Sequence, residues 1–159
     1  KIKIDNEKKK LLKNNTVIFF TGFQRIAQNI EKSKIIDMKN KYEYYNKIYS
    51  LANDAKKILE SKNKNFLDDV GILLNESWKY KKELSSKVSN KNIDDLYSFG
   101  INNGAIGGKL LGAGAGGFFM FLTKNQIDKK KLINKLNKIH HVDYDFDELG
   151  SQIIYKNLD

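Results

Sequence analysis

The chain has 159 residues, of which 40% are hydrophobic and 30% are charged, a balance that predicts one soluble globular domain able to bury a core. It contains no cysteine, which excludes disulfides and cysteine-bound metals and fits a reducing, cytoplasmic setting. No stretch approaches the ~18 apolar residues needed to cross a bilayer, so we expect no membrane partner.

The formal net charge of +10 comes almost entirely from lysine, because Arg25 is the only arginine. Proteins that read nucleic acids rely on arginine for bidentate base contacts and stacking. Here the lysines are spread along predicted helices, with runs at residues 8–10 and 129–131. We therefore expect solvated helix faces and no nucleic-acid partner. A non-catalytic basic domain that binds nucleic acid is the alternative.

The first half of the chain predicts one strand and three helices. Residues 16–20 are β-branched and aromatic, as in a buried strand, and Thr21-Gly22 ends it. Thr21 could cap a helix with its apolar residues at Phe23, Ile26, Ala27 and Ile30 and with Arg25 on the other face. Longer helices are predicted from about 41 to 59 and from about 65 to 87. The latter has Trp78 on its buried face and a separate polar stripe of Asn75, Lys79 and Lys82.

The second half predicts a helix that starts near Asn92 and ends near Asn103-Gly104, followed by a glycine-rich loop at residues 107–117 and a strand at 117–123. Asn125 is expected to cap a further helix, and two short strands are expected at 141–146 and 152–155. Strands from both ends of the chain must then pair. The order therefore predicts an α+β domain with a mostly antiparallel sheet.

The glycine loop carries six of the chain's 11 glycines and lies between apolar segments. Glycine tolerates positive φ and lets backbone amides approach a ligand. Consecutive amides directed into one concavity bind anions such as phosphate. The alternative is a tight hairpin without a ligand. His140 and His141 lack the carboxylate or cysteine neighbours of a metal site, so we predict no metal site.

The segment Gly108-Lys109-Leu110-Leu111-Gly112-Ala113-Gly114-Ala115-Gly116-Gly117, with the hydrophobic strand after it, resembles the third motif of the GHMP kinases. Residues 20–25, 74–79 and 150–154 resemble the sugar-1-kinases of the heptose-phosphate and fucose type within that family. Ala115 stands where the family usually carries glycine, which costs stability if φ is positive there. The resemblance implies that residues 1–159 form a GHMP kinase C-terminal domain. Its fold would be a four-stranded, ferredoxin-like antiparallel sheet with several packed helices.

The first two motifs of the family have no match in this chain. The resemblance therefore implies a partner, the N-terminal half of the same kinase, which would bind most of ATP and Mg²⁺. The chain alone would be inactive. The implied reaction is ATP-dependent phosphorylation of the anomeric hydroxyl of D-glycero-D-manno-heptose 7-phosphate, for polysaccharide synthesis. A fucose-type or other sugar-1-kinase and a purely structural module are the alternatives.

The resemblance also assigns site residues but no catalytic base and no oligomeric state. The loop residues beside the transferred phosphate would be Gly112, Ala113, Gly114, Ala115 and Gly116. Arg25 is the candidate for gripping a sugar phosphate bidentately, with a structural salt bridge as the alternative. Thr21 either only caps a helix or also contacts substrate, and Lys109 points either to the site or to solvent. Asn75, Lys79 and Lys82 either line the cleft or form an exposed helix face.

Overall fold

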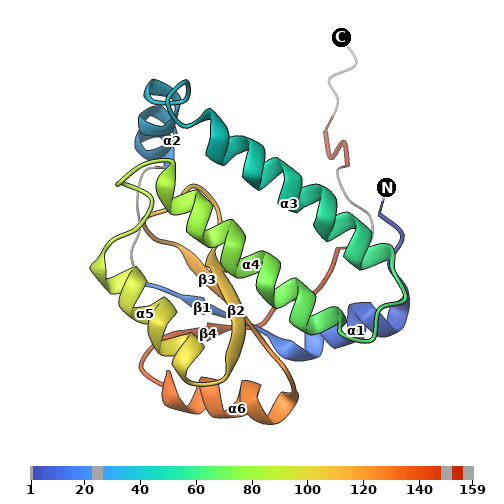
Figure 1. Cartoon of the computed structure of the whole chain (residues 1–159). Helices are drawn as coiled ribbons and strands as arrows, with labels where there is room; N and C mark the ends of the chain where they lie inside the picture. The colour runs from blue at the N-terminus through green and yellow to red at the C-terminus, as the bar shows by residue number, and fades with distance from the viewer. Residues whose placement is uncertain (1, 23–26, 148–151, 156–159) are drawn as a thin grey trace.

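The α+β architecture is confirmed by a computed structural model, which describes residues 2–22, 27–147 and 152–155 (Figure 1). In chain order the elements are α1 (Asn6–Asn15), β1 (Thr16–Phe20), α2 (Ala27–Ile36), α3 (Tyr42–Glu60), α4 (Phe66–Glu83), α5 (Lys91–Asn102), β2 (Ala105–Leu110), β3 (Phe118–Thr123), α6 (Gln126–Lys135) and β4 (His140–Val142).

The four strands form one antiparallel sheet in the order β2-β3-β1-β4. The predicted pairing between the two ends of the chain is confirmed, because β1 lies between β3 and β4. Phe20 pairs with Phe118 on one side and with His140 on the other. The loop between β2 and β3 therefore lies at the same edge of the sheet as the end of β1.

The core lies between one face of this sheet and helices α4, α5 and α6. Phe119 and Phe121 on β3 are fully buried, and their rings stack at 4.7 Å between centroids. Trp78 of α4 meets Phe119 edge-on at 5.8 Å and is 1% exposed, which confirms it as a core residue. Leu96 of α5 and Leu132 of α6 close the same core.

Helix α4 lies against β2, and α3 packs on α4 (Figure 1). The contact between α4 and β2 is made by backbone, because a Cβ at Gly107 would lie 2.3 Å from the carbonyl oxygen of Gly71. The two glycines therefore let the helix approach the strand without intervening side chains.

Two helix starts follow the predicted capping chemistry. The side chain of Asn125 accepts a hydrogen bond of 2.9 Å from the amide of Asp128 at the start of α6, as predicted. Helix α5 begins slightly earlier than predicted, since Asn90 rather than Asn92 is its cap and accepts a hydrogen bond of 3.1 Å from Ile93.

Other elements differ from the predictions. Helix α1 was not predicted, because its lysine- and asparagine-rich sequence shows little apolar periodicity. Helix α4 ends at Glu83, and β4 covers only His140–Val142. The strand expected at residues 152–155 is wrong, since these residues pair with none of the described strands and Ile154 is 97% exposed. Of the expected helix after Thr21, Phe23, Arg25 and Ile26 lie outside the described residues, and α2 begins at Ala27.

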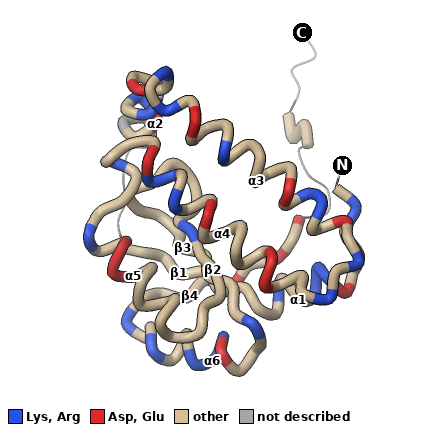
Figure 2. The backbone as a smooth tube through the Cα atoms, viewed as in Figure 1, with Lys and Arg blue, Asp and Glu red and all other residues tan. Residues whose placement is uncertain are grey.

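The charged residues are mixed along the chain. Figure 2 shows lysines on several helices with acidic residues between them. Among the described residues, no helix combines the length and the apolar character that a membrane span requires.

Candidate functional site

The predicted glycine loop at residues 107–117 is shorter in the structure, because β2 continues to Leu110. The glycine loop, from here on residues 111–117, is built largely from left-handed backbone conformations. Gly112, Gly114 and Gly117 have φ values of 71°, 126° and 92°, a region that favours glycine. Ala115 also has a positive φ of 62°, so the expected penalty of about 1–2 kcal/mol for a side chain there applies. Its methyl group is fully buried in the core.

The loop is held against the connection between α4 and α5. The amide of Ala115 donates a hydrogen bond of 2.6 Å to the carbonyl oxygen of Val88. A Cβ at Gly114 would lie 2.9 Å from the Cα atom and the carbonyl oxygen of Val88. Gly114 is therefore required both by its φ and by the space available.

The carbonyl oxygens of the loop and its flanks accept hydrogen bonds from the protein. The Lys81 ammonium on α4 donates to Leu110 at 2.9 Å and to Gly112 at 2.5 Å. The Lys34 ammonium on α2 donates to Ala113 at 2.7 Å. At the far end of the loop, the amide and hydroxyl of Thr21 both donate to Gly117, at 2.8 and 2.9 Å.

Unlike the carbonyl groups, most amide groups of the loop have no hydrogen-bond partner among the residues that the structure describes. Within the described part of the chain, none of the amides of Gly112, Ala113, Gly114, Gly116 and Gly117 donates a hydrogen bond. The loop therefore turns several acceptors toward lysines, and apart from the amides of Leu111 and Ala115 its donors have no partner within the described residues. Such a run of unpartnered amides can bind an anion.

The region behind the loop carries an excess of positive charge. Burial, followed by the nearby ammonium groups of Lys109 and Lys34, lowers the pKa of Lys81 to about 8, against a smaller opposing effect of Glu31. Lys34 forms an ion pair of 2.9 Å with Glu31, and its side chain is only 8% exposed. Three lysines thus face one carboxylate, so the potential at the loop favours a bound anion.

Two further predicted site residues, Thr21 and Lys109, are placed relative to the loop by the structure. Thr21 is bonded directly to Gly117, which places it at the loop, whereas Arg25 lies outside the described residues. Lys109 immediately precedes Leu110 on β2, and its ammonium donates a hydrogen bond of 2.7 Å to the hydroxyl of Ser77 on α4. Burial lowers the pKa of Lys109. Its side chain lines a mostly apolar cavity of about 270 Å³ between α3 and α4.

The stripe of Asn75, Lys79 and Lys82 lines a second cavity, of about 290 Å³, beside Tyr97 of α5. Asn75 also supports the fold: its amide donates to Ile106 at 3.0 Å, and its oxygen accepts from the Gly108 amide at 3.1 Å and the Tyr97 hydroxyl at 3.0 Å. Lys82 forms an ion pair of 3.1 Å with Asp94. The structure therefore brings the three residues together in a cavity that shares no residue with the glycine loop.

Trp78 lines this second cavity as well. Its indole N–H is buried and has no hydrogen-bond partner within the described residues. A ligand acceptor in the cavity would satisfy a group that the fold leaves unpaired.

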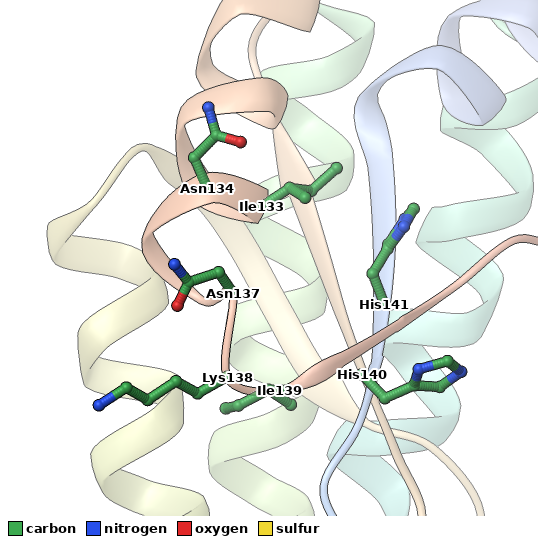
Figure 3. Close-up of a pocket in the computed structure, with 7 residues that line it drawn as sticks. All are labelled: Ile133, Asn134, Asn137, Lys138, Ile139, His140 and His141. Atoms are coloured by element: carbon green, nitrogen blue, oxygen red, sulfur yellow. The ribbon is translucent and has the colours of Figure 1, made fainter.

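A third cavity, of about 550 Å³, lies where α6 meets β4 and includes His140 and His141 (Figure 3). Figure 3 shows the two imidazoles pointing in different directions. In the described ranges, no three His, Cys, Asp or Glu side chains gather in a way that could hold a metal ion.

Lys34 and Lys81 were not predicted as site residues. They lie 79 and 29–31 residues from the carbonyl groups that they hold. Each lysine also fits an ordinary polar helix face. No local pattern therefore distinguishes them from the chain's other lysines.

Comparisons with known proteins agree with this fold and this loop. A family model described as "GHMP kinases C terminal" matches residues 46–141. The D-glycero-alpha-D-manno-heptose 7-phosphate kinase of Campylobacter jejuni is 36% identical over 130 residues, which cover 80% of this chain and 37% of the relative. The bifunctional fucokinase/GDP-fucose pyrophosphorylase of Arabidopsis thaliana is 30% identical over 135 residues, covering 84% of this chain and 12% of the relative.

Among solved structures, the mevalonate kinase of Methanococcus jannaschii has a TM-score of 0.68 at 27% identity, covering 88% of this chain and 42% of that protein. The chain thus spans well under half the length of each of these relatives.

Proposed function

Because the chain belongs to the GHMP kinase family, as its C-terminal domain, we propose that it forms the C-terminal part of an ATP-dependent sugar kinase. The proposed reaction transfers the γ-phosphoryl group of ATP to the anomeric hydroxyl of D-glycero-D-manno-heptose 7-phosphate. The relative from Campylobacter jejuni, which is named for that substrate, supports this choice. The N-terminal half of the kinase is the proposed partner of this domain.

The observation that carries the proposal is the arrangement of the glycine loop. The amides of Gly112, Ala113, Gly114, Gly116 and Gly117 have no partner within the described residues, and the carbonyl groups at the start of the loop are held by Lys34 and Lys81. Phosphoryl transfer depends mainly on positioning and on stabilising the charge of the transferred group. Preorganised amides supply both, since they need little reorganisation during the reaction.

The proposed substrate contacts lie in three places. Thr21 lies at the edge of the sheet that carries the loop. Arg25, four residues further along the chain, is the proposed phosphate ligand, because a guanidinium can bind a phosphate with two hydrogen bonds. Lys109 lies on β2 two residues before the loop and lines the cavity between α3 and α4, and Asn75, Lys79 and Lys82 line the cavity beside α5. We assign Mg²⁺, which would neutralise phosphate charge, and most contacts with ATP to the N-terminal half.

The test is a coupled ADP-release assay on the full-length parent protein with heptose 7-phosphate, fucose and mannose. Gly114→Val should abolish turnover, because its side chain would collide with Val88 and displace the loop. Arg25→Ala should raise the KM for the sugar phosphate. Lys91→Met is the control, because the side chain of Lys91 is 85% exposed and its ion pair is with the exposed Asp95. Turnover of none of the sugars would refute the proposal.

A fucose-type kinase is the second candidate, and the similarity to the Arabidopsis fucokinase supports it. The two candidates differ in whether the sugar already carries a phosphate. Turnover of fucose at a kcat/KM above that of heptose 7-phosphate would favour the second candidate.

A further inference from the structure

Two lysines reach the glycine loop from helices that are distant in sequence. Lys34 comes from α2 and Lys81 from α4, and together they bind the carbonyl oxygens of Leu110, Gly112 and Ala113. We call Lys34 and Lys81 the lysine clamp. The three carbonyl groups are nearly consecutive, so the clamp fixes the orientation of the peptide planes at the start of the loop.

A peptide plane carries its carbonyl and the next residue's amide on opposite sides. A carbonyl held toward a lysine therefore turns the following amide away from it. The carbonyl of Gly112 is bonded to Lys81 and that of Ala113 to Lys34, so the amides of Ala113 and Gly114 are turned away from the clamp. Neither amide donates a hydrogen bond within the described residues.

We propose that Lys34 and Lys81 are positioning residues for phosphoryl transfer, which hold the loop carbonyls so that the loop amides face the transferred phosphate. This inference rests on the proposed function and extends it to two residues that do not themselves touch the substrate. The two ammonium groups also place positive charge behind the amides, on the side away from the phosphate.

Charge at the clamp responds to an anion in the loop. The charged groups that act on Lys81 are Lys109 on β2 and Lys34 and Glu31 on α2. Burial and the two neighbouring lysines lower the pKa of Lys81 to about 8. A bound phosphate would raise this pKa, because an opposite charge favours the protonated form. Binding near pH 8 should therefore take up protons, by up to about half a proton per site.

The first experiment measures kcat and KM of the full-length kinase across pH. Lys81→Met and Lys34→Met should each lower kcat by roughly 10- to 100-fold, because small displacements of positioning groups have effects of this size. Their KM for the sugar phosphate should change much less. Lys81→Arg should restore part of kcat and extend activity above about pH 8, since a guanidinium stays protonated there. Lys91→Met is the control with the same loss of charge on an exposed helix surface.

The second experiment measures ATP binding to the full-length protein by calorimetry near pH 8, in two buffers that differ in ionisation enthalpy. The wild-type protein should take up protons on binding, and Lys81→Arg should bind ATP without that uptake. A purely structural role would leave proton uptake unchanged.

The outcomes separate this inference from the proposed function. Normal turnover and an unchanged pH profile in both methionine variants would overturn the clamp and leave the sugar kinase standing. Proton uptake that disappears in Lys81→Arg, in a protein that phosphorylates none of the sugars, would support the clamp and overturn the substrate assignment. Failure of the wild-type protein to bind ATP would overturn both.

Discussion

Replacing Gly107 by alanine tests the contact between α4 and β2 that places Lys81 near the loop. Gly107 has no positive φ, so only the added methyl group matters. That Cβ would lie 2.3 Å from the carbonyl oxygen and 2.6 Å from the Cα atom of Gly71. Both are backbone atoms, which cannot rotate away. The helix and the strand must therefore separate by about 1 Å to restore ordinary contact.

The size of the effect follows from what this separation breaks. Asn75, one turn further along α4, bonds Ile106 at 3.0 Å and the amide of Gly108 at 3.1 Å, and both would move beyond hydrogen-bond range. Two lost hydrogen bonds cost about 2 kcal/mol. Strain from overpacking adds about 1–3 kcal/mol. Alanine also lowers the conformational entropy of the unfolded chain, which stabilises the folded state by about 0.5 kcal/mol. We expect a net loss of about 3 kcal/mol in the free energy of unfolding.

Urea unfolding followed by the fluorescence of Trp78, the only tryptophan, measures this loss. With a typical m-value, the midpoint should fall by roughly 1.5 M. Gly112→Ala is the control, since its Cβ would meet nothing within 4 Å but its φ is 71°. It should cost only about 1 kcal/mol. A loss at Gly107→Ala no larger than at Gly112→Ala would refute the backbone contact between α4 and β2.

Three further predictions concern the loop and its supports. Lys81 has a pKa of about 8 when folded and 10.5 when unfolded, so the unfolded state holds more protons above pH 8. Stability should rise by about 1–2 kcal/mol from about pH 7.5 to about pH 9.5, and Lys81→Met should remove most of that rise in urea titrations. Ala115→Val should cost about 3 kcal/mol in thermal unfolding, because a β-branched residue disfavours a φ of 62° and the site is fully buried. Asn75→Ala should cost about 2–4 kcal/mol in the same measurement, and a change in substrate KM without loss of stability would contradict the bridging role of Asn75.

Elements with strong local signals were predictable from the sequence. The start of α6 follows from Asn125 as a cap, and β1 follows from its run of β-branched and aromatic residues. The pairing of β1 with β3 follows from the need to bury both strands in one core. The glycine loop and its flanking strands were specific enough to indicate the family, which the match over residues 46–141 confirms.

Predictions failed where local sequence carries little information. The segment 152–155 is apolar enough to suggest a strand, yet Ile153 is 84% exposed and pairs with none of the strands in the described part of the chain. A strand needs a partner as well as propensity, and propensity alone does not supply one. Helix α1 shows the reverse case. Its polar sequence gives little sign of a helix, yet a helix forms there. Asp5 caps it, because its carboxylate accepts a hydrogen bond of 2.7 Å from the Lys8 amide.

The lysine clamp could not be predicted because its parts meet only in the folded chain. The charges of the clamp are energetically unfavourable in the folded protein. Neutral side chains could bond loop carbonyls without the penalty of placing Lys34, Lys81 and Lys109 near one another. Among the described residues, Glu31 partly offsets that repulsion, and burial disfavours the charge on Lys81 further. Unfavourable charges kept beside unpartnered amides are typical of functional sites, and the proposed anionic substrate would give them a role. On this argument, phosphate binding should raise the free energy of unfolding of the wild-type kinase more than it raises that of the Lys81→Met variant. An equal increase in both proteins would show that the charge of the clamp does not act on the anion.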